Sequence, residues 1–313
     1  MTSERGPMND VSGHHEPVPR EVLRQVRRIE LRTRGAVDSR FSGEYQSVFK
    51  GQGLEFVEVR EYLPGDDVRT IDWNVSARTG KPHVKRYVEE RELTLLLVVD
   101  LSASMRFGTV ERFKSETVAE VAAVLAMSAS RNNDRVGLLA FTDRVELFLP
   151  PRKGRRHVLR LIRELLACEP AGRGSAAPEA LEYAMRVLRS RSIVFLFSDF
   201  RFEGGWEPFE RAVRTTARRH DTVAVRLVDH REEVLPDMGL LRVADPETGE
   251  VLLLDTAKRE VREAYARAAA EERDRGRRLF RRIAVDEIEL HTGERYAPAL
   301  LGFFQRRETR LRR

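Results

Sequence analysis

Two carboxylates and three hydroxyls in this sequence have the types and the spacing of a divalent-cation site. Asp100, Ser102 and Ser104 alternate along one stretch of chain, and alternate side chains of an extended loop point the same way. A second carboxylate, Asp199, and a third hydroxyl, Ser175, stand further along the chain. Hard oxygen ligands of this kind suit Mg²⁺ or Mn²⁺, with water completing an octahedron. The residue types therefore predict a metal site.

An ion held mainly by hydroxyls receives little charge from its ligands, so it stays electrophilic and can accept a carboxylate from a partner. A structural interpretation competes with this one. In that interpretation Ser102 and Ser104 cap the following helix, and Asp100 caps a turn. Each residue taken alone favours the structural interpretation. The five taken together, with Asp199 at a second strand end, favour a metal site.

The elements that must position these residues alternate between strands and helices from residue 93 onward. Apolar runs at 93–99 and 192–197 predict strands buried on both faces, which end at Asp100 and at Asp199. Ser175 belongs to a Gly-rich loop that opens the next predicted helix. Strands that alternate with helices form an open, mostly parallel sheet with helices on both faces, and such sheets bind ligands outside the carboxyl ends of the strands. We therefore expect the two carboxylates at one edge of an α/β sheet.

The same patterns divide the rest of the chain. Further strands are predicted at 135–141, 144–148, 222–228 and 283–290, with a hairpin at 240–254 and helices at 111–131, 157–167, 178–189, 206–218, 257–282 and 297–304. Strand-like runs at 54–59 and 82–88, joined by turn signals, predict a small β-rich segment. The expected organisation is a disordered tail at 1–19, a helical lead-in at 20–40, the β-rich segment at 41–92, the sheet domain at 93–305 and a basic tail at 306–313.

The Asp-x-Ser-x-Ser run at 100–104, the Gly-x-Ser loop and Asp199 resemble the metal-ion-dependent adhesion site (MIDAS) of von Willebrand factor A domains. That family normally has Thr at the position of Ser175, with Ala-Leu at a fixed distance, and Ala180-Leu181 keep this spacing. The resemblance implies a von Willebrand factor A-like (Rossmann-like) sheet. It also implies direct metal ligands, Ser102, Ser104 and Ser175, and carboxylates that act mostly through water, Asp100 and Asp199.

A narrower resemblance covers residues 40–305. The run from Phe56 to Trp73, followed by Ser76-Ala77-Arg78, is similar to the signature of the bacterial domain of unknown function 58 family. The run from Asp229 to Asp237 is similar as well, with His230 where that family usually has Pro. Members of this family are commonly encoded beside MoxR-type AAA+ ATPases and are thought to act with them. The resemblance therefore implies an adaptor or co-chaperone in the assembly or maturation of protein complexes.

The first signature can also be interpreted from its residues alone. Three arginines stand close in sequence to three aspartates, so a web of ion pairs is expected, and Trp73 is expected to hold this segment against the sheet domain. The residues are Arg60, Asp66, Asp67, Arg69, Asp72, Trp73 and Arg78. They form either a docking surface for a partner or a brace between domains, and the two interpretations are compatible.

Composition excludes several classes of protein. The 56 Lys+Arg are interspersed with 50 Asp+Glu, for a net charge of +6, and aromatic residues do not alternate with the basic ones, which argues against nucleic-acid binding. One cysteine, Cys168, excludes an internal disulfide framework and fits a reducing compartment. The apolar stretches are far shorter than the roughly 18 residues of a membrane span, and the first twenty residues are polar. We expect a cytoplasmic protein without a membrane span.

Two functions stay in competition. The favoured hypothesis is a non-enzymatic, divalent-metal-dependent protein-interaction module, with a MoxR-type AAA+ ATPase and a client protein as its partners. The alternative is a Mg²⁺-dependent, phosphatase-like hydrolase that uses Asp100. Haloacid-dehalogenase-like phosphatases need a second carboxylate two residues after the nucleophile, and Ser102 occupies that position here. No general base is evident from the spacing of the residues, so we expect no enzyme.

Overall fold

Strands that are apolar on both sides must be covered on both faces, and this requirement organises the computed structural model of the chain. The structure describes residues 20–36, 41–49, 54–89, 92–109, 112–202 and 205–311. Six strands form its largest sheet, in the order β10-β7-β6-β3-β4-β5. Their bounds are β3 Thr94–Asp100, β4 Arg135–Phe141, β5 Val145–Arg152, β6 Ile193–Ser198, β7 Asp221–Val228 and β10 Asp286–His291. All neighbours pair in parallel except β4 and β5.

The order of the strands creates a switch point between β3 and β6. After β3 the chain builds β4 and β5 on one side, then returns to place β6 on the other side of β3. Leu97 pairs with Phe195 and Val99 with Phe197, so the two strands run in register up to their carboxyl ends. In sheets with this topology ligands bind at such a point, because the loops after the two strands diverge and leave a crevice.

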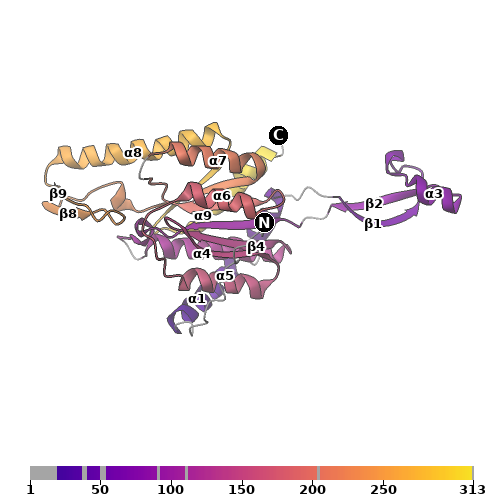
Figure 1. Cartoon of the computed structure of the whole chain (residues 1–313), viewed down its shortest axis with the longest axis horizontal. Helices are drawn as coiled ribbons and strands as arrows, with labels where there is room; N and C mark the ends of the chain where they lie inside the picture. Colours follow the sequence, from indigo (N-terminus) through magenta and orange to yellow (C-terminus); the bar gives the residue numbers. More distant parts are fainter. Residues whose placement is uncertain are drawn as a thin grey trace, which may run out of the picture.

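Helices cover both faces of the sheet (Figure 1). The bounds on one face are α1 Arg20–Ala36, α2 Ser42–Val48, α4 Lys114–Arg131, α5 Arg155–Ala167 and α9 Tyr296–Leu311. On the other face they are α6 Ala177–Val187, α7 Glu207–Arg219 and α8 Arg259–Arg282. A hydrophobic core lies on each side of the sheet, and alternate residues of β3 pack into one or the other. Leu95 and Leu97 face α4, whereas Leu96 and Val98 face the helices on the opposite side.

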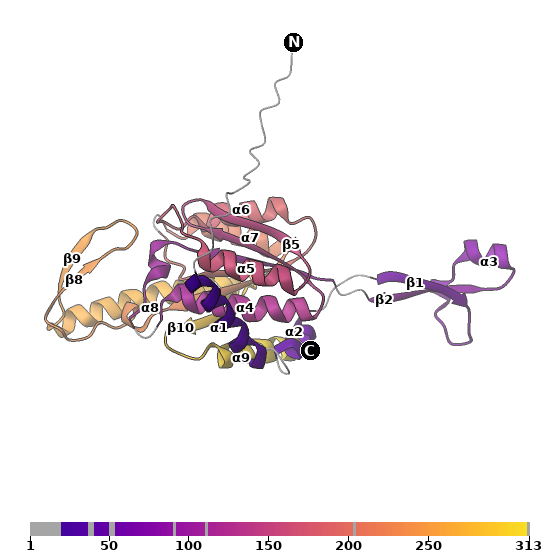
Figure 2. The same ribbon diagram turned by 90° about the horizontal axis from the view of Figure 1, so that it is seen from below.

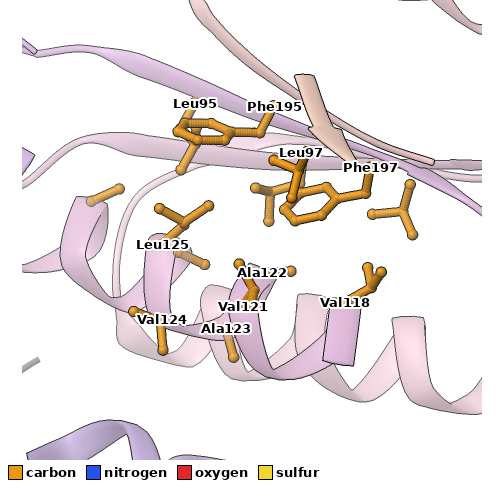
Figure 3. Packing of buried hydrophobic residues seen from close by; sticks show 14 of the residues in the cluster. Leu95, Leu97, Val118, Val121, Ala122, Ala123, Val124, Leu125, Phe195 and Phe197 are labelled. Carbon is orange, nitrogen blue, oxygen red and sulfur yellow. The ribbon is translucent and has the colours of Figure 1, made fainter. Parts of the chain in front are cut away.

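The packing of α4 shows how the core fixes the edge that carries the candidate site. Val118, Val121 and Leu125 of this helix lie under the side chains of β3 and β6 (Figure 3). Small residues such as Ala122 let the helix approach the sheet closely. Because α4 begins at Lys114, this contact also sets the position of that residue relative to the ends of β3 and β6.

Two hairpins lie at opposite ends of the molecule (Figure 2). One pairs β1 Leu54–Glu61 with β2 His83–Glu89 and carries a short helix, α3 Trp73–Thr79, at its tip. The other pairs β8 Leu240–Ala244 with β9 Val251–Asp255 beside the start of α8. The first hairpin precedes the amino end of β3, and the turn of the second lies near the carboxyl ends of the strands.

The predicted fold class, an α/β fold whose mostly parallel sheet has helices on both faces, is confirmed. Two boundaries differ from the expected ones. Residues 41–49 were expected in the β-rich segment but include α2, because Phe41, Tyr45 and Val48 recur at helical spacing and are buried in the core beside Phe304. The basic tail expected from residue 306 instead continues α9 to Leu311.

The extension of α9 has a physical cause in its arginines. Arg307 pairs with Asp221 and Asp286, and its guanidinium lies 4.7 Å from the centre of the Phe49 ring. Arg310 pairs with Asp286 as well. These contacts hold the last turns of the helix on the sheet domain. The disordered tail expected at 1–19 lies outside the described residues, and no helix in the described part of the chain is long and apolar enough to cross a membrane.

Candidate functional site

Asp100 ties together the segments that meet at the switch point. It is the last residue of β3 and is fully buried. Its Oδ2 accepts hydrogen bonds from the hydroxyls of Ser175, at 2.7 Å, and Ser198, at 2.8 Å. Its Oδ1 accepts one from the backbone N–H of Ser102, at 2.9 Å. A single carboxylate therefore fixes the loop after β3, the end of β6 and the loop before α6.

The hydroxyls of Ser102 and Ser104 lie 3.2 Å apart, and both residues are buried. Two ligands on neighbouring corners of a magnesium octahedron, each about 2.1 Å from the ion, are separated by about 3.0 Å. The stretch was expected as an extended loop, but Ala103–Arg106 forms a 3₁₀ turn. The Ser102 side chain makes no capping bond to this turn, so the structural interpretation accounts for Asp100 but not for the Ser102 hydroxyl.

Ser175 completes the group of hydroxyls. Its loop is held to the segment after β3 by a hydrogen bond from the Ala103 N–H to the Arg173 carbonyl, at 2.8 Å. Gly172 is required in this loop, because a Cβ there would lie 2.2 Å from the Thr142 hydroxyl. The structure therefore places Ser175 on the same carboxylate that orients Ser102.

Asp199 lies beside this group and is bound to a buried lysine that the sequence analysis missed. Nζ of Lys114 donates to Asp199 Oδ2 at 2.8 Å and to Glu232 Oε1 at 2.7 Å, and the lysine side chain is fully buried. Burial by itself lowers the pKa of Lys114, but the charges of the two carboxylates overcome this effect and raise it. Lys114 lies in the first turn of the helix predicted at 111–131, where a cation opposes the helix dipole, and this was the signal in the sequence.

The pKa values of the two aspartates move in opposite directions. Burial and the nearby charge of Asp199 raise the pKa of Asp100 to about 6. Burial also acts to raise the pKa of Asp199, but Lys114, Arg201 and a hydrogen bond from Ser104 outweigh it and lower the value. An added cation near Asp100 would favour its ionised form. Lys114 is a cation already present at the site. The site stabilises the negative charge of Asp199 but not that of Asp100.

Glu232 and Asp229 come from the second signature motif and were not among the predicted site residues. Asp229 follows β7 and is fully buried, where its side chain accepts hydrogen bonds from the backbone N–H of Thr109 at 2.9 Å and from the hydroxyl of Thr292 at 2.6 Å. It thereby holds the segment after β3 against the end of β10. His230, beside it, is exposed and takes no part in this network.

A cavity of about 450 Å³ gives access to the site from one side. Ser104 and Asp199 line it together with Tyr265 and Ala268 of α8 and Asp245 in the turn of the β8–β9 hairpin. Asp100 and Ser102 lie deeper, fully buried behind this cavity. A ligand that reaches the candidate site through this cavity therefore meets Ser104 and Asp199 first.

The side chains present fit a hard divalent cation held by hydroxyls. Among the described residues, no group of three or more His, Cys, Asp or Glu side chains could hold a metal ion. An ion at this edge would be held by Ser102, Ser104 and Ser175, whose neutral oxygens Mg²⁺ accepts together with water. All five predicted site residues lie at the carboxyl ends of β3 and β6 or in the adjoining loop.

The predicted docking residues lie elsewhere, on the β1–β2 hairpin. Arg60 binds Asp66 through two hydrogen bonds of 2.7 and 2.8 Å, whereas Asp67 and Asp72 accept backbone N–H groups at the starts of two short helical turns. Of the expected web of ion pairs, the part that the described residues show is this bidentate pair. Asp67 and Asp72 also take the role of caps, for which aspartates at helix starts are preferred.

Trp73 does not hold the hairpin against the sheet domain, so this expectation was wrong. Its side chain is 71% exposed at the start of α3. Arg69 and Arg78 are exposed as well, and neither forms an ion pair with another residue that the structure describes. The reason is geometric, because the hairpin tip lies at the far end of the molecule from the sheet (Figure 1).

Comparison with known proteins finds relatives whose functions are unknown. An uncharacterized protein of Mycobacterium tuberculosis is 33% identical over 282 residues, which cover 89% of this chain and 87% of that protein. The uncharacterized protein YeaD of Bacillus subtilis is 30% identical over 107 residues, or 34% of this chain and 25% of that protein.

Solved structures show more distant likenesses. The conserved hypothetical protein BatB from Bacteroides thetaiotaomicron has a TM-score of 0.45 and 15% identity, over 69% of this chain and 99% of that one. The SpRpn10 VWA domain has a TM-score of 0.39 and 10% identity, over 67% of this chain and 94% of that one. Family membership rests on the sequence, because the family described as Protein of unknown function DUF58 matches residues 58–275. The chain belongs to this DUF58 family, as its two signature motifs predicted.

Proposed function

We propose that this chain is a divalent-metal-dependent protein-interaction module that captures a carboxylate from its partner. The observation that supports this best is the arrangement around buried Asp100 at the switch point of the sheet. Asp100 binds the Ser175 hydroxyl and the Ser102 N–H, and the Ser102 hydroxyl lies beside that of Ser104. Ser102, Ser104 and Ser175 would hold Mg²⁺ or Mn²⁺, and Asp100 would orient them. When bound, the ion supplies a positive charge that the neutral hydroxyls do not cancel, so it attracts a partner's Asp or Glu.

The same geometry argues against the alternative, a phosphatase-like hydrolase. A nucleophilic carboxylate must present an oxygen to its substrate. Both oxygens of Asp100 accept hydrogen bonds instead, and the residue is fully buried. We therefore propose a non-enzymatic role and expect clean protein to show no phosphate-ester turnover.

We further propose that the partner is a MoxR-type AAA+ ATPase and that the chain acts as a cytoplasmic adaptor or co-chaperone for a client protein. The exposure of Trp73, Arg69 and Arg78 supports a second contact surface on the β1–β2 hairpin, because Trp and Arg are the residues most often found at the centres of interfaces. The two surfaces lie at opposite ends of the molecule (Figure 2), which suits a protein that connects two others.

Binding to a purified MoxR-type AAA+ ATPase of the same organism tests this proposal. The chain is immobilised, and the ATPase is applied in Mg²⁺ or in EDTA. We expect the dissociation constant to rise at least tenfold in EDTA and in Asp100→Asn, which keeps the shape of the side chain. Asp274→Asn on the exposed face of α8 is the matched control and should bind as the wild type does.

A dissociation constant that changes neither in EDTA nor in Asp100→Asn would contradict the proposed metal dependence. In that case Trp73→Ala separates the remaining possibilities. Loss of binding in this variant would assign the contact to the hairpin tip, and unchanged binding would exclude the ATPase surface proposed here. Turnover of phosphate esters by the wild type that disappears in Asp100→Asn would favour the hydrolase instead.

A further inference from the structure

Lys114 occupies a position that a lysine ordinarily avoids. It is the first residue of α4, where the positive end of the helix dipole disfavours a cation, and its burial removes the water that would solvate its charge. Two charge-assisted hydrogen bonds, to Asp199 and to Glu232, offset both costs. Residues that break a local preference in this way cluster at functional sites.

We infer that Lys114 is a tethered cation that keeps Asp199 and Glu232 from binding the divalent ion directly. This inference rests on the proposed function and assigns to Lys114 control over how the metal is held. One oxygen of each carboxylate is already bound to the ammonium group, at 2.8 and 2.7 Å. The ion is therefore left to the serine hydroxyls and to water.

The consequence concerns the charge that the ion presents to a partner. Two carboxylates bonded to Mg²⁺ would cancel its charge and remove its attraction for a third. With the lysine in place, Asp100, Asp199 and Glu232 supply three negative charges. Two cations lie beside them, Lys114 and Arg201, whose Nε lies 4.0 Å from Glu232. One divalent ion then leaves the site with a single positive charge. That charge matches one carboxylate from a partner.

Metal binding by the purified chain tests the inference without any partner. Mn²⁺ is titrated into the protein and the free ion is measured by electron paramagnetic resonance. We expect Lys114→Met to bind Mn²⁺ about tenfold more tightly than the wild type, because two carboxylates become available and one positive charge is removed. Lys114→Arg keeps the charge and should bind as the wild type does. Lys81→Met removes an exposed, paired lysine at the hairpin tip and is the matched control.

A second variant keeps the test decisive if Lys114→Met does not fold. Lys114→Met combined with Glu232→Gln removes one of the two carboxylates that the single substitution leaves unpaired. This double variant frees Asp199 alone, and we expect it to bind Mn²⁺ more tightly than Glu232→Gln. Affinity and stoichiometry that match those of the corresponding protein with Lys114 intact would overturn the inference.

The outcomes separate this inference from the proposed function. Wild-type protein that binds no ion, beside a Lys114→Met variant that does, would contradict the proposed metal dependence and support the role of Lys114. Wild-type protein whose binding is lost in Asp100→Asn, beside a Lys114→Met variant with unchanged affinity, would support the metal site and overturn the role of Lys114.

Discussion

The two ends of the molecule hold their charged groups in opposite ways. At the carboxyl edge of the sheet, Lys114 and Asp199 are buried, and each charge is fixed by direct hydrogen bonds. At the tip of the β1–β2 hairpin, Arg69, Arg78 and Trp73 are exposed. Buried charges are tied to the stability of the fold because water cannot replace a lost partner, whereas exposed ones are free to associate. Substitutions at the edge are therefore expected to lower stability strongly, and substitutions at the tip are expected to change it little.

Aromatic residues of the core of the sheet domain and of the hairpin tip give the largest predicted difference. Phe304 is buried and contacts three aromatic rings of residues 41–49, so Phe304→Ala should lower the free energy of unfolding by about 3–5 kcal/mol. Trp73→Ala should change it by less than about 0.5 kcal/mol, because the side chain is exposed. Urea unfolding of the two variants measures both values. A cost above about 1.5 kcal/mol for Trp73→Ala would show that the tip packs against the body.

Charged residues from the two regions give a comparable contrast. Lys114→Met leaves two buried carboxylates without their cation and should cost about 3–5 kcal/mol in the absence of divalent ions. Arg60→Met breaks a partly exposed pair with Asp66 and should cost at most about 1 kcal/mol. The measurement is again urea unfolding, now in EDTA. Equal costs would contradict the distinction between the two ends.

Protonation of His220 should destabilise the sheet domain at a higher pH than the one at which acid affects the hairpin. Burial lowers the pKa of His220 to about 4, so this residue binds fewer protons in the folded state than in the unfolded state below pH 6.5. The stability that His220 contributes is then full above pH 6.5 and falls by about 2 kcal/mol as the pH drops to 4, whereas the raised pKa of Asp100, about 6, contributes in the opposite direction. At the tip, the Arg60 guanidinium lowers the pKa of Asp66. The contribution of this carboxylate to stability is therefore lost only as the pH falls below 3.8.

Replacement of the histidine checks this assignment. In His220→Gln the amide oxygen can accept the hydrogen bond that Nδ1 of His220 takes from the Ser192 N–H, at 3.2 Å, and no ring remains to be protonated. Relative to the wild type, the variant should therefore become more stable as the pH drops from 6.5 to 4, when urea midpoints are compared across this range. A pH dependence of the same size in both proteins would assign the acid sensitivity to other groups.

The smallest predicted effect concerns Ser175. Ser175→Thr keeps the hydroxyl that binds Asp100 and adds one methyl group to a half-buried side chain. We expect stability within about 0.5 kcal/mol of the wild type and Mg²⁺ affinity a few-fold higher, because a β-branched side chain has fewer rotamers to lose. Isothermal titration calorimetry measures the affinity. A lower affinity than that of the wild type would mean that the loop has no room for the methyl group.

Much of the sheet and its site could be predicted from the sequence because the signals were local. Apolar runs at 93–99 and 192–197 have no stable place except in a buried sheet, and the residues that follow them must lie at its edge. The strand expected at 93–99 is β3, and the one expected at 192–197 is β6. Ser175 was predicted from its Gly-rich loop before a helix and from the resemblance, and the structure puts its hydroxyl on Asp100.

What could not be predicted depends on contacts between segments distant in sequence. Lys114 lies 85 residues before Asp199 and 118 before Glu232, and no pattern within its own helix indicates either partner. The position of α2 depends on contacts of Tyr45 and Phe49 with the Phe304 ring of α9, which lies far away in the sequence. Trp73 was expected in a packed contact because a tryptophan is usually buried, whereas here it is exposed at the tip of a hairpin.

The most direct test of the metal site is a crystal of this chain soaked in Mn²⁺ and measured at a wavelength where manganese scatters anomalously. We expect one strong anomalous peak about 2.1 Å from the hydroxyl oxygens of Ser102, Ser104 and Ser175, with Lys114 still bound to Asp199. A soaked crystal without such a peak, or with the ion bonded to other residues, would contradict it.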